Sequence, residues 1–303
     1  MSFDEIMLEM VIPEEYKGKR LDQALASLLP EYSRERIKSW IQQGECLVNG
    51  VSWKPKAKVA GGEAVCINAQ LPVETECVPE DIPLDIVYED DDILVINKPK
   101  GLVVHPGAGN PKGTLVNALL FYNAELEKIP RAGIVHRLDK DTTGLMVIAK
   151  TLQAHTALVE QLEARTVQRT YETIVSGTFT AGGTVDAPIG RHGTDRIKMA
   201  VTETGKPAIT HYRVLTRYSD FTHLQCRLET GRTHQIRVHM SHIKHPIVGD
   251  KVYGGRLKMP KGASETVKQT IREFPRQALH AKALGLVHPS SSEPMASEIP
   301  LPD

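Results

Sequence analysis

A short polar stretch, Asp139–Gly144, lies between two apolar runs and carries residues that could do chemistry. The apolar runs, Ile134–Leu138 and Leu145–Ala149, have the composition of strands, so we expect a tight loop between them. Arg137 and Asp139 are two residues apart and would lean to the same face of an extended chain. A carboxylate at a strand end can act as a nucleophile or a base. Aspartate is also a common turn residue, so a simple turn cap is the alternative.

Two further side chains could take part in such chemistry. Tyr171 lies in a predicted strand, Arg169–Ser176, where core packing is the usual role of an aromatic residue. Arg237 lies in a predicted strand, Thr233–His239, with Gln235 on the same face. This arginine could keep a nearby carboxylate ionised, or it could form a structural ion pair elsewhere.

Histidine and cysteine spacing does not favour a metal site. Three of the four candidate histidines are three residues apart, and not four as two ligands on one helical face would require. The cysteines lack the close paired spacing of a thiolate zinc site or a disulfide framework. The glycines form no phosphate-cradling pattern, so we expect neither a metal nor another cofactor. The histidines are His234, His239, His242 and His245, and the cysteines are Cys46, Cys66, Cys77 and Cys226.

Length and composition indicate a soluble protein with one large and one small domain. The chain has 303 residues, of which 41% are hydrophobic, which excludes a disordered chain. The 37 Lys and Arg residues balance the 37 Asp and Glu residues, so any basic surface for nucleic acid must be local. No apolar run approaches the roughly 20 residues of a membrane span, and no secretory signal opens the chain. We therefore expect a cytoplasmic protein without a membrane partner.

The N-terminal part predicts a small helical and hairpin domain over residues 18–75, after an extended lead-in over residues 1–17. Two helices, Arg20–Leu29 and Ser33–Gln43, precede a hairpin turn at Asn49–Gly50. Residues 33–58 contain six Lys or Arg and two Asp or Glu, which is either an ordinary solvated face or a phosphate-binding surface. The basic residues that we expect to contact RNA there are Arg34, Lys38 and Lys54.

An acidic segment separates this domain from the rest of the chain. Residues 74–92 hold nine Asp or Glu and no Lys or Arg, so we expect residues 76–92 to be a linker and the boundary to fall near residue 80. The second domain, residues 82–303, has many short predicted strands and few helices between them. This pattern favours an α+β fold with a mostly antiparallel sheet.

Several blocks of sequence resemble one known family. The string His136–Gly144, with the sequence HRLDKDTTG, resembles the catalytic motif of the RluA family of pseudouridine synthases. Further blocks match in the same order, so that the resemblance covers about residues 82–303, and residues 18–67 resemble the S4 RNA-binding domain. The other matching blocks are Asn97–His105, Arg169–Tyr171, Leu228–His239, Gly249–Gly254 and Arg276–Ala281.

The resemblance implies a bent, mixed sheet with the cleft on one face, and it implies roles for individual residues. Asp139 would be the catalytic carboxylate, either attacking the sugar of a uridine or removing a sugar proton. Arg237 would pair with Asp139. Tyr171 would stack on the target uracil and is a candidate to accept its carbon 5 proton. Arg137 would enter the RNA and help displace the target base. Other residues expected to contact the RNA are His136, Arg232 and Gln235.

The resemblance over the whole chain also implies a substrate. It favours large-subunit (23S) ribosomal RNA and, within it, the helix 69 stem-loop, modified by a monomer. Family members with the same motifs modify other ribosomal or transfer RNA sites, which is one alternative. Another is a non-catalytic S4-type RNA-binding assembly factor, which would not need Asp139, Tyr171 and Arg237 together. A third is a nucleoside hydrolase, which would release free uracil.

Overall fold

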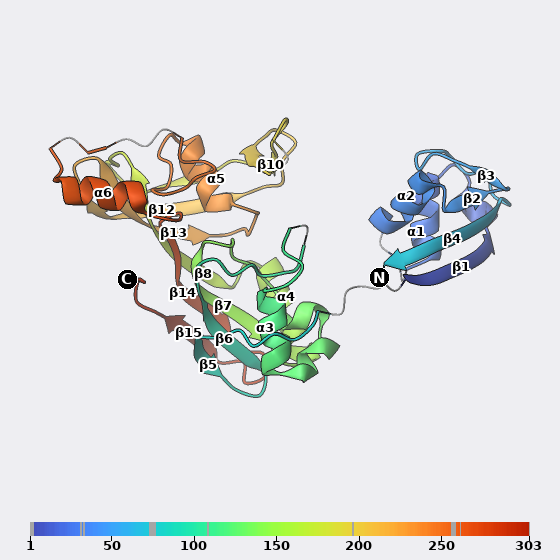
Figure 1. Cartoon of the computed structure of the whole chain (residues 1–303), viewed down its shortest axis with the longest axis horizontal. Coiled ribbons are helices and arrows are strands. Elements are labelled where there is room, and N and C mark those ends of the chain that lie inside the picture. The colour runs from blue at the N-terminus through green and yellow to red at the C-terminus, as the bar shows by residue number, and fades with distance from the viewer. Residues whose placement is uncertain are drawn as a thin grey trace. The chain divides into compact units, whose positions relative to one another are not determined.

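The chain divides into two compact units. In the computed structural model these are an N-terminal unit, Met1–Glu76, and a C-terminal unit, Cys77–Asp303 (Figure 1). None of the helices among the described residues has the length and apolar character needed to cross a membrane. The structure describes residues 3–30, 32, 34–72, 77–107, 109–195, 197–255, 259–260 and 262–302.

The N-terminal unit packs two helices against a four-stranded sheet. Helix α1 is Leu21–Leu28 and helix α2 is Arg34–Gln43, as their apolar spacing predicts. Ile37 and Ile41 are buried on the inner face of α2, also as predicted, while the expected N-cap, Ser33, lies outside the described residues. The sheet has the order β1-β4-β2-β3, with β1 Phe3–Val11, β4 Ala64–Pro72, β2 Cys46–Val48 and β3 Val51–Ser52.

The hairpin prediction is confirmed, and the lead-in predicted over residues 1–17 is extended from Phe3 to Val11 but forms part of the sheet there. Asn49 and Gly50 connect β2 and β3 with φ values of 50° and 77°, as a two-residue hairpin turn requires. Strand β1 pairs antiparallel with β4 from Phe3 to Val11, and the short helix η1 (Glu14–Tyr16) follows it. The first strand was missed because its polar residues weaken the apolar pattern.

The C-terminal unit is built on one bent, nine-stranded mixed sheet (Figure 1). Its order is β5-β6-β7-β14-β8-β13-β12-β9, and β15 pairs with β14. The pair β7 and β14 is parallel and the other pairings of this sheet are antiparallel, so the predicted α+β class with a mostly antiparallel sheet is confirmed. The strands are β5 Ile86–Glu89, β6 Ile93–Lys98, β7 Thr143–Ala149, β8 Gln168–Ser176, β9 Gly183–Asp186, β12 Ile209–Arg217, β13 Phe221–Leu228, β14 Leu279–Val287 and β15 Pro294–Glu298.

Helices and a small second sheet accompany the two halves of this sheet. In Figure 1, α3 and α4 lie beside the half that contains β6 and β7, and α5 lies beside the half that contains β12 and β13. A large core cluster on one face of the sheet includes Leu119, Ile148, Tyr171 and Ile236. The remaining elements are α3 Leu115–Tyr122, η2 Ala124–Lys128, η3 Pro130–Gly133, α4 Leu152–Glu163, β10 Ile189–Arg191, β11 Met199–Val201, α5 Gln235–His242 and α6 Glu265–Glu273.

Part of the segment predicted as an acidic linker, residues 76–92, belongs to the C-terminal unit instead. Ile86–Glu89 forms β5 at the edge of the large sheet. Closer to the boundary, the backbone N–H of Glu80 donates to the carbonyl of Asn117, and the Asn117 amide donates to the carbonyl of Val78. The acidic residues are therefore the solvent-facing part of an ordered edge, and charge repulsion does not prevent their pairing.

Two predicted strands near the candidate site are also wrong. Ile134–Leu138 is not a strand: Ile134 makes a single bridge to Ile148 and the chain then turns away. Thr233–His239 is not a strand either, because most of it lies in helix α5, Gln235–His242. All residues from 235 to 240 are buried, both the apolar and the polar ones. The alternation of apolar and polar side chains there therefore does not separate a buried face from an exposed face, as it would in a half-buried strand.

Candidate active site

A buried lysine forms a hydrogen bond with the backbone of the loop that carries Asp139. Lys98, at the end of β6, is completely buried, and its ammonium donates hydrogen bonds to three carbonyl oxygens, at 2.8–2.9 Å. One of these carbonyls belongs to Lys140, next to Asp139, and the others to Pro99 and Leu102. Burial lowers the pKa of Lys98 to about 8, while the carboxylates of Asp141 and Asp139 oppose that change. The lysine thus fixes the loop backbone beside Asp139.

The start of the loop is fixed by His136. The Val147 N–H of β7 donates to His136 Nε2 at 3.1 Å, and burial together with the charge of Arg169 lowers the pKa of His136 to about 3. This histidine is neutral and half-buried, with its Nε2 already bonded inside the fold, and its RNA contact stays a prediction.

The end of the loop is fixed against β14. Gln277 donates to Thr142 Oγ1 at 3.0 Å, and Thr143 bonds His280 at 2.8 Å. Gly144 has a φ of 116°, and a Cβ there would lie 2.3 Å from the carbonyl oxygen of Ala281, so only glycine allows β7 to approach β14 this closely. Asp139 therefore sits on a loop held at both ends by the large sheet.

Asp139 pairs with Arg237, as predicted. Arg237 Nη1 donates to Asp139 Oδ2 at 2.9 Å, although the two residues are 98 positions apart in the chain. The Asp139 side chain is 15% exposed and that of Arg237 is 7% exposed. A carboxylate that pairs with an arginine and still reaches solvent can act as a nucleophile or a general base.

A second carboxylate orients Arg237. Arg237 Nε and Nη2 donate to the two oxygens of Asp250 at 2.7 and 3.0 Å, which is the bidentate geometry that arginine favours. Burial acts to lower the pKa of Arg237, but the hydrogen bonds and charges of Asp250 and Asp139 raise it above its ordinary value. The backbone N–H groups of Val252 and Tyr253 also donate to Asp250. Asp250 thus fixes the guanidinium that holds Asp139.

A histidine and a tyrosine lie on the other side of Asp139. His234 Nε2 is 3.8 Å from Asp139 Oδ1, and His234 Nδ1 is 2.7 Å from the Tyr253 hydroxyl. The Tyr253 hydroxyl accepts a hydrogen bond from the Met199 N–H, which leaves its proton to donate to His234 Nδ1. Burial lowers the pKa of His234, with Asp139 opposing that change, so the neutral ring presents an Nε2–H toward the carboxylate.

Tyr171 and Arg137 differ in exposure. Tyr171 faces the core from β8, and burial raises the pKa of its hydroxyl; the charge of Arg169 acts against this change, and that of Asp139 adds to it. The phenol is therefore protonated at neutral pH, which argues against an ionised tyrosine as a standing base. Arg137 is exposed, two residues before Asp139, where it can reach a bound molecule.

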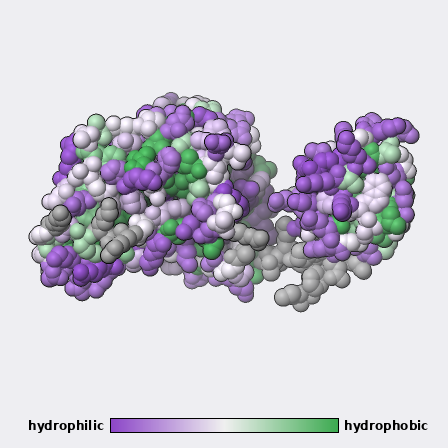
Figure 2. All heavy atoms as spheres, turned by 90° about the horizontal axis from the view of Figure 1, so that it is seen from above, coloured by the Kyte–Doolittle hydropathy of each residue, from purple (hydrophilic) through white to green (hydrophobic). Residues whose placement is uncertain are grey.

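The structure separates the other residues predicted to bind RNA into internal and exposed groups. Gln235 is 3% exposed, and its amide bonds four partners in the fold, including Thr230 and the N–H of Arg232, so its predicted RNA contact is wrong. Arg232 is half-buried and donates to the carbonyl of Pro207. Arg34 bonds Asp22. Lys38 and Lys54 are exposed, on a unit whose visible face in Figure 2 is mostly hydrophilic.

Residues that could hold a metal ion do not gather around Asp139. Of the described side chains, Asp90, Asp92 and His288 form one group with suitable ligand spacing. Asp92 directly precedes β6, whereas Lys98, which bonds the loop of Asp139, is the last residue of the same strand. The group and Asp139 therefore lie at opposite ends of β6. His288 and the Tyr88 hydroxyl already bond Asp90. The four histidines considered from the sequence do not form such a group.

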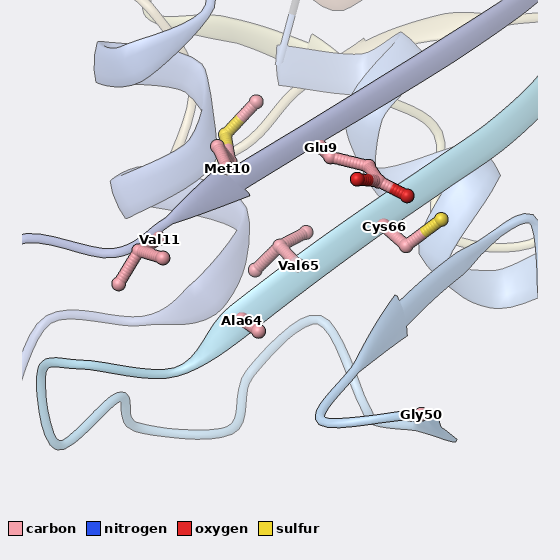
Figure 3. Close-up of a pocket in the computed structure, with 7 residues that line it drawn as sticks. All are labelled: Glu9, Met10, Val11, Gly50, Ala64, Val65 and Cys66. Carbon is pink, nitrogen blue, oxygen red and sulfur yellow. The ribbon is translucent and has the colours of Figure 1, made fainter.

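A pocket in the N-terminal unit does not suit RNA phosphate. It lies over β1 and β4, and Figure 3 shows the carboxylate of Glu9 among its lining residues. No lysine or arginine lines it, so it lacks the positive charge that phosphate recognition needs. Its lining residues are Glu9, Met10, Val11, Gly50, Ala64, Val65 and Cys66.

The sequence did not lead to the residues that position Asp139 indirectly, by bonding its loop or its neighbours. Lys98, Asp250 and Tyr253 each lie inside a block that resembles the RluA family, yet none of them was among the expected site residues. Lys98 had a usable signal, because a lysine directly after a run of four apolar residues and an asparagine is placed to enter the protein interior. From the sequence, His234 was interpreted as a polar contact with RNA in preference to a metal ligand, and it was not connected with Asp139.

Comparisons with known proteins agree with this geometry. The family model for RNA pseudouridylate synthase matches residues 92–242, and the model for the S4 domain matches residues 19–65. Ribosomal large subunit pseudouridine synthase D of Escherichia coli is 60% identical over 298 residues, covering 98% of this chain and 91% of that protein. The protein of the same name from Xanthomonas campestris is 56% identical over 300 residues, covering 99% and 91%.

Solved structures give the same result for the fold and family. Human RNA pseudouridylate synthase domain containing 1 has a TM-score of 0.56 and 27% identity, covering 73% of this chain and 84% of that one. Human RNA pseudouridylate synthase domain containing 4 has a TM-score of 0.55 and 28% identity, covering 72% and 88%. The chain belongs to the RluA family of RNA pseudouridine synthases and carries an S4 RNA-binding domain in its N-terminal unit.

Proposed function

We propose that this enzyme converts uridine to pseudouridine in large-subunit (23S) ribosomal RNA, with Asp139 as the catalytic carboxylate. The observation that supports the chemical assignment is the ion pair between Asp139 and Arg237, in which the carboxylate still reaches solvent. The substrate assignment rests on relatives at 56% and 60% identity that are named for the ribosomal large subunit and match both units of the chain.

The reaction needs few groups. The N-glycosidic bond of the uridine breaks, the uracil turns, and carbon 5 joins the sugar as its proton leaves. Asp139 either attacks the sugar or removes a sugar proton, and Arg237 pairs with it and orients it for either role. Tyr171 offers an aromatic face to the displaced uracil, and exposed Arg137 helps to displace the base from its stack. No metal or other cofactor takes part.

The N-terminal unit contributes affinity for RNA without reading its sequence. Lys38 and Lys54 are exposed and free to approach phosphates, whereas Arg34 is half-exposed and shares its charge with Asp22. Neutralising Lys38 and Lys54 together should weaken RNA binding and flatten its salt dependence, while the same uridines are modified. Loss of modification at one uridine only would instead assign site recognition to this unit.

We infer that the enzyme works as a monomer in the cytoplasm and that its target is the helix 69 stem-loop. A uridine in a stem-loop can leave its stack more readily than one in a continuous duplex, which suits an enzyme that must enclose the base. The second candidate is another ribosomal or transfer RNA site, because the motifs around Asp139 do not depend on the RNA that carries the uridine.

Mapping of pseudouridine in ribosomal RNA tests the proposal. In cells that lack this protein, we expect the helix 69 pseudouridines to be missing and to return when the purified enzyme acts on that unmodified RNA. Intact helix 69 pseudouridines with losses elsewhere would exclude the named target and leave the chemistry in place. Release of free uracil by the purified enzyme would contradict the isomerase assignment itself.

A further inference from the structure

Arg169 is a buried arginine whose Nε atom has no hydrogen-bond partner among the described residues. It lies on β8, and its residue is 8% exposed. The described part of the chain gives its guanidinium no ion pair. Arginine keeps its proton at any physiological pH, so it cannot relieve the cost of burial by becoming neutral. A buried, unpaired charge is unfavourable in a folded protein, and Arg169 therefore calls for a partner that the fold does not supply.

Other arginines in the chain show the usual arrangement. Arg237 bonds two carboxylates, and Arg217 donates to the carbonyl oxygens of Phe179 and Thr180. Arg169 has neither type of partner. Arg237 is the other buried arginine of the described residues and its guanidinium is fully engaged, so the orphaned Nε is a feature of the Arg169 position.

The surroundings of Arg169 belong to the site already described. Arg169 and Tyr171 are two residues apart on one face of β8, about 7 Å along the strand. The charge of Arg169 lowers the pKa of His136, which fixes the start of the Asp139 loop, and opposes the rise in the pKa of Tyr171. Gly231 lies directly against the guanidinium, because a Cβ there would be 2.7 Å from Arg169 Nη1.

We propose that Arg169 binds the RNA phosphate next to the target uridine. The proposal rests on the pseudouridine synthase function, since it is the RNA that supplies the partner. A phosphate is a fitting ligand because its oxygens match the donor fork of a guanidinium. Arg169 and Tyr171 lie on the same face of β8 about 7 Å apart, so a uracil against Tyr171 would place a phosphate of the same nucleotide or its neighbour near Arg169. The glycine at position 231 leaves room for the guanidinium to turn toward it.

The test replaces single phosphates in a synthetic helix 69 stem-loop with uncharged methylphosphonates. The wild-type enzyme should lose about 10- to 100-fold in affinity when one phosphate next to the target uridine is replaced. The Arg169→Gln variant should bind the unmodified RNA more weakly by that same factor and lose nothing more at that position. Arg227→Gln is the matched control, because Arg227 is exposed on the neighbouring strand β13.

Thermal stability separates this role from a structural one. Removing an unpaired buried charge should leave the melting temperature of the RNA-free enzyme unchanged or higher, whereas removing a structural arginine would lower it. Wild-type-like RNA affinity for Arg169→Gln, or an equal loss at every phosphate position, would overturn the proposal. If that variant does not fold, Gly231→Ala, which displaces the guanidinium, should lose the same position-specific affinity, and unchanged affinity would overturn the proposal.

The same experiment keeps the two claims apart. Pseudouridine formation by the wild-type enzyme in the stem-loop reports the proposed function, independently of Arg169. Absence of product from the wild-type enzyme would count against the function or its target. Normal wild-type turnover with unaltered binding by Arg169→Gln would count against the phosphate site alone.

Discussion

Two clusters in this chain combine aspartate and arginine in opposite proportions. In the N-terminal unit, one carboxylate, Asp22, lies between two arginines, Arg20 and Arg34. In the C-terminal unit, one arginine, Arg237, lies between two carboxylates, Asp139 and Asp250. The first cluster therefore has an excess of positive charge and the second an excess of negative charge.

The difference shows how the same ion pair can be structural or reactive. Asp22 is 1% exposed and both of its oxygens accept hydrogen bonds from arginine, so nothing remains to react. Asp139 accepts one arginine hydrogen bond and is 15% exposed, while Asp250 takes the bidentate side of the guanidinium. Sharing one arginine leaves Asp139 paired with a cation but incompletely bonded, which is what a catalytic carboxylate needs.

The largest effect should follow from breaking the shared arginine. Arg237→Lys keeps a positive charge but cannot bond both carboxylates, so turnover should fall about 10³-fold. Because Asp250 would be left partly unpaired, some loss of stability is expected too. The double variant Arg237→Gln/Asp250→Asn should recover stability without recovering turnover, and Arg227→Gln is the control. Single-turnover rates at saturating RNA are the measurement, and a near wild-type rate for the double variant would contradict the shared-arginine model.

A smaller effect should come from the carboxylate that orients the arginine. Asp250→Asn leaves one acceptor oxygen in place of the bidentate carboxylate, so Arg237 is free to change its orientation and the catalytic rate should fall about 10- to 100-fold. RNA affinity should change little, because Asp250 is buried and cannot touch the substrate. Partial recovery in Asp250→Glu would support a positioning role. A variant with weaker RNA binding and an unchanged rate at saturation would show that Asp250 acts on binding instead.

The structural cluster should behave in the opposite way. Asp22→Asn leaves two arginines without their carboxylate and should lower the free energy of unfolding of the N-terminal unit by about 1–3 kcal/mol, with turnover at saturating RNA unchanged. Both tryptophans of the chain, Trp40 and Trp53, lie in this unit, so fluorescence during urea unfolding reports it selectively. Glu35→Gln, at an exposed position on α2, is the control. Loss of turnover in Asp22→Asn would contradict the assignment of a structural role to Asp22.

The smallest effect should appear in acid. Burial raises the pKa of both Asp22 and Asp250, but their arginine hydrogen bonds outweigh burial, so both pKa values lie below the ordinary range. The unfolded chain therefore takes up protons first as the pH falls below about 4, and the stability from each carboxylate is progressively lost. Fluorescence-detected urea midpoints should decrease below that pH, and less so in Asp22→Asn. A urea midpoint that rises as the pH falls would contradict the lowered pKa values of Asp22 and Asp250.

Most helices and strands that depend on nearby residues were predicted well from the sequence. Contacts between distant parts of the chain were not. Helices α1 and α2 and strand β7 followed from apolar spacing, because each is decided within a dozen residues. Helix α5 was read as a strand, since a helix buried on every side has no polar face to set its period.

Pairing of Asp139 with Arg237 could not come from spacing at all. The two residues are 98 positions apart and meet only because the Asp139 loop and α5 converge, so the family resemblance supplied the expectation. The internal role of Gln235 was missed in part for the same reason, because two of its four hydrogen-bond partners, Ile209 and Thr210, lie about 25 residues from it in the chain.

One measurement tests most directly whether Asp139 is the reacting group. Asp139→Asn keeps an oxygen that can accept the hydrogen bond from Arg237 Nη1, so its fold and RNA affinity should match the wild type. Unmodified ribosomal RNA would be incubated with each purified protein and its pseudouridines counted by chemical mapping. We predict product from the wild-type enzyme and none above background from Asp139→Asn, at equal amounts of bound RNA. Pseudouridine formed by Asp139→Asn at near the wild-type rate would contradict the account.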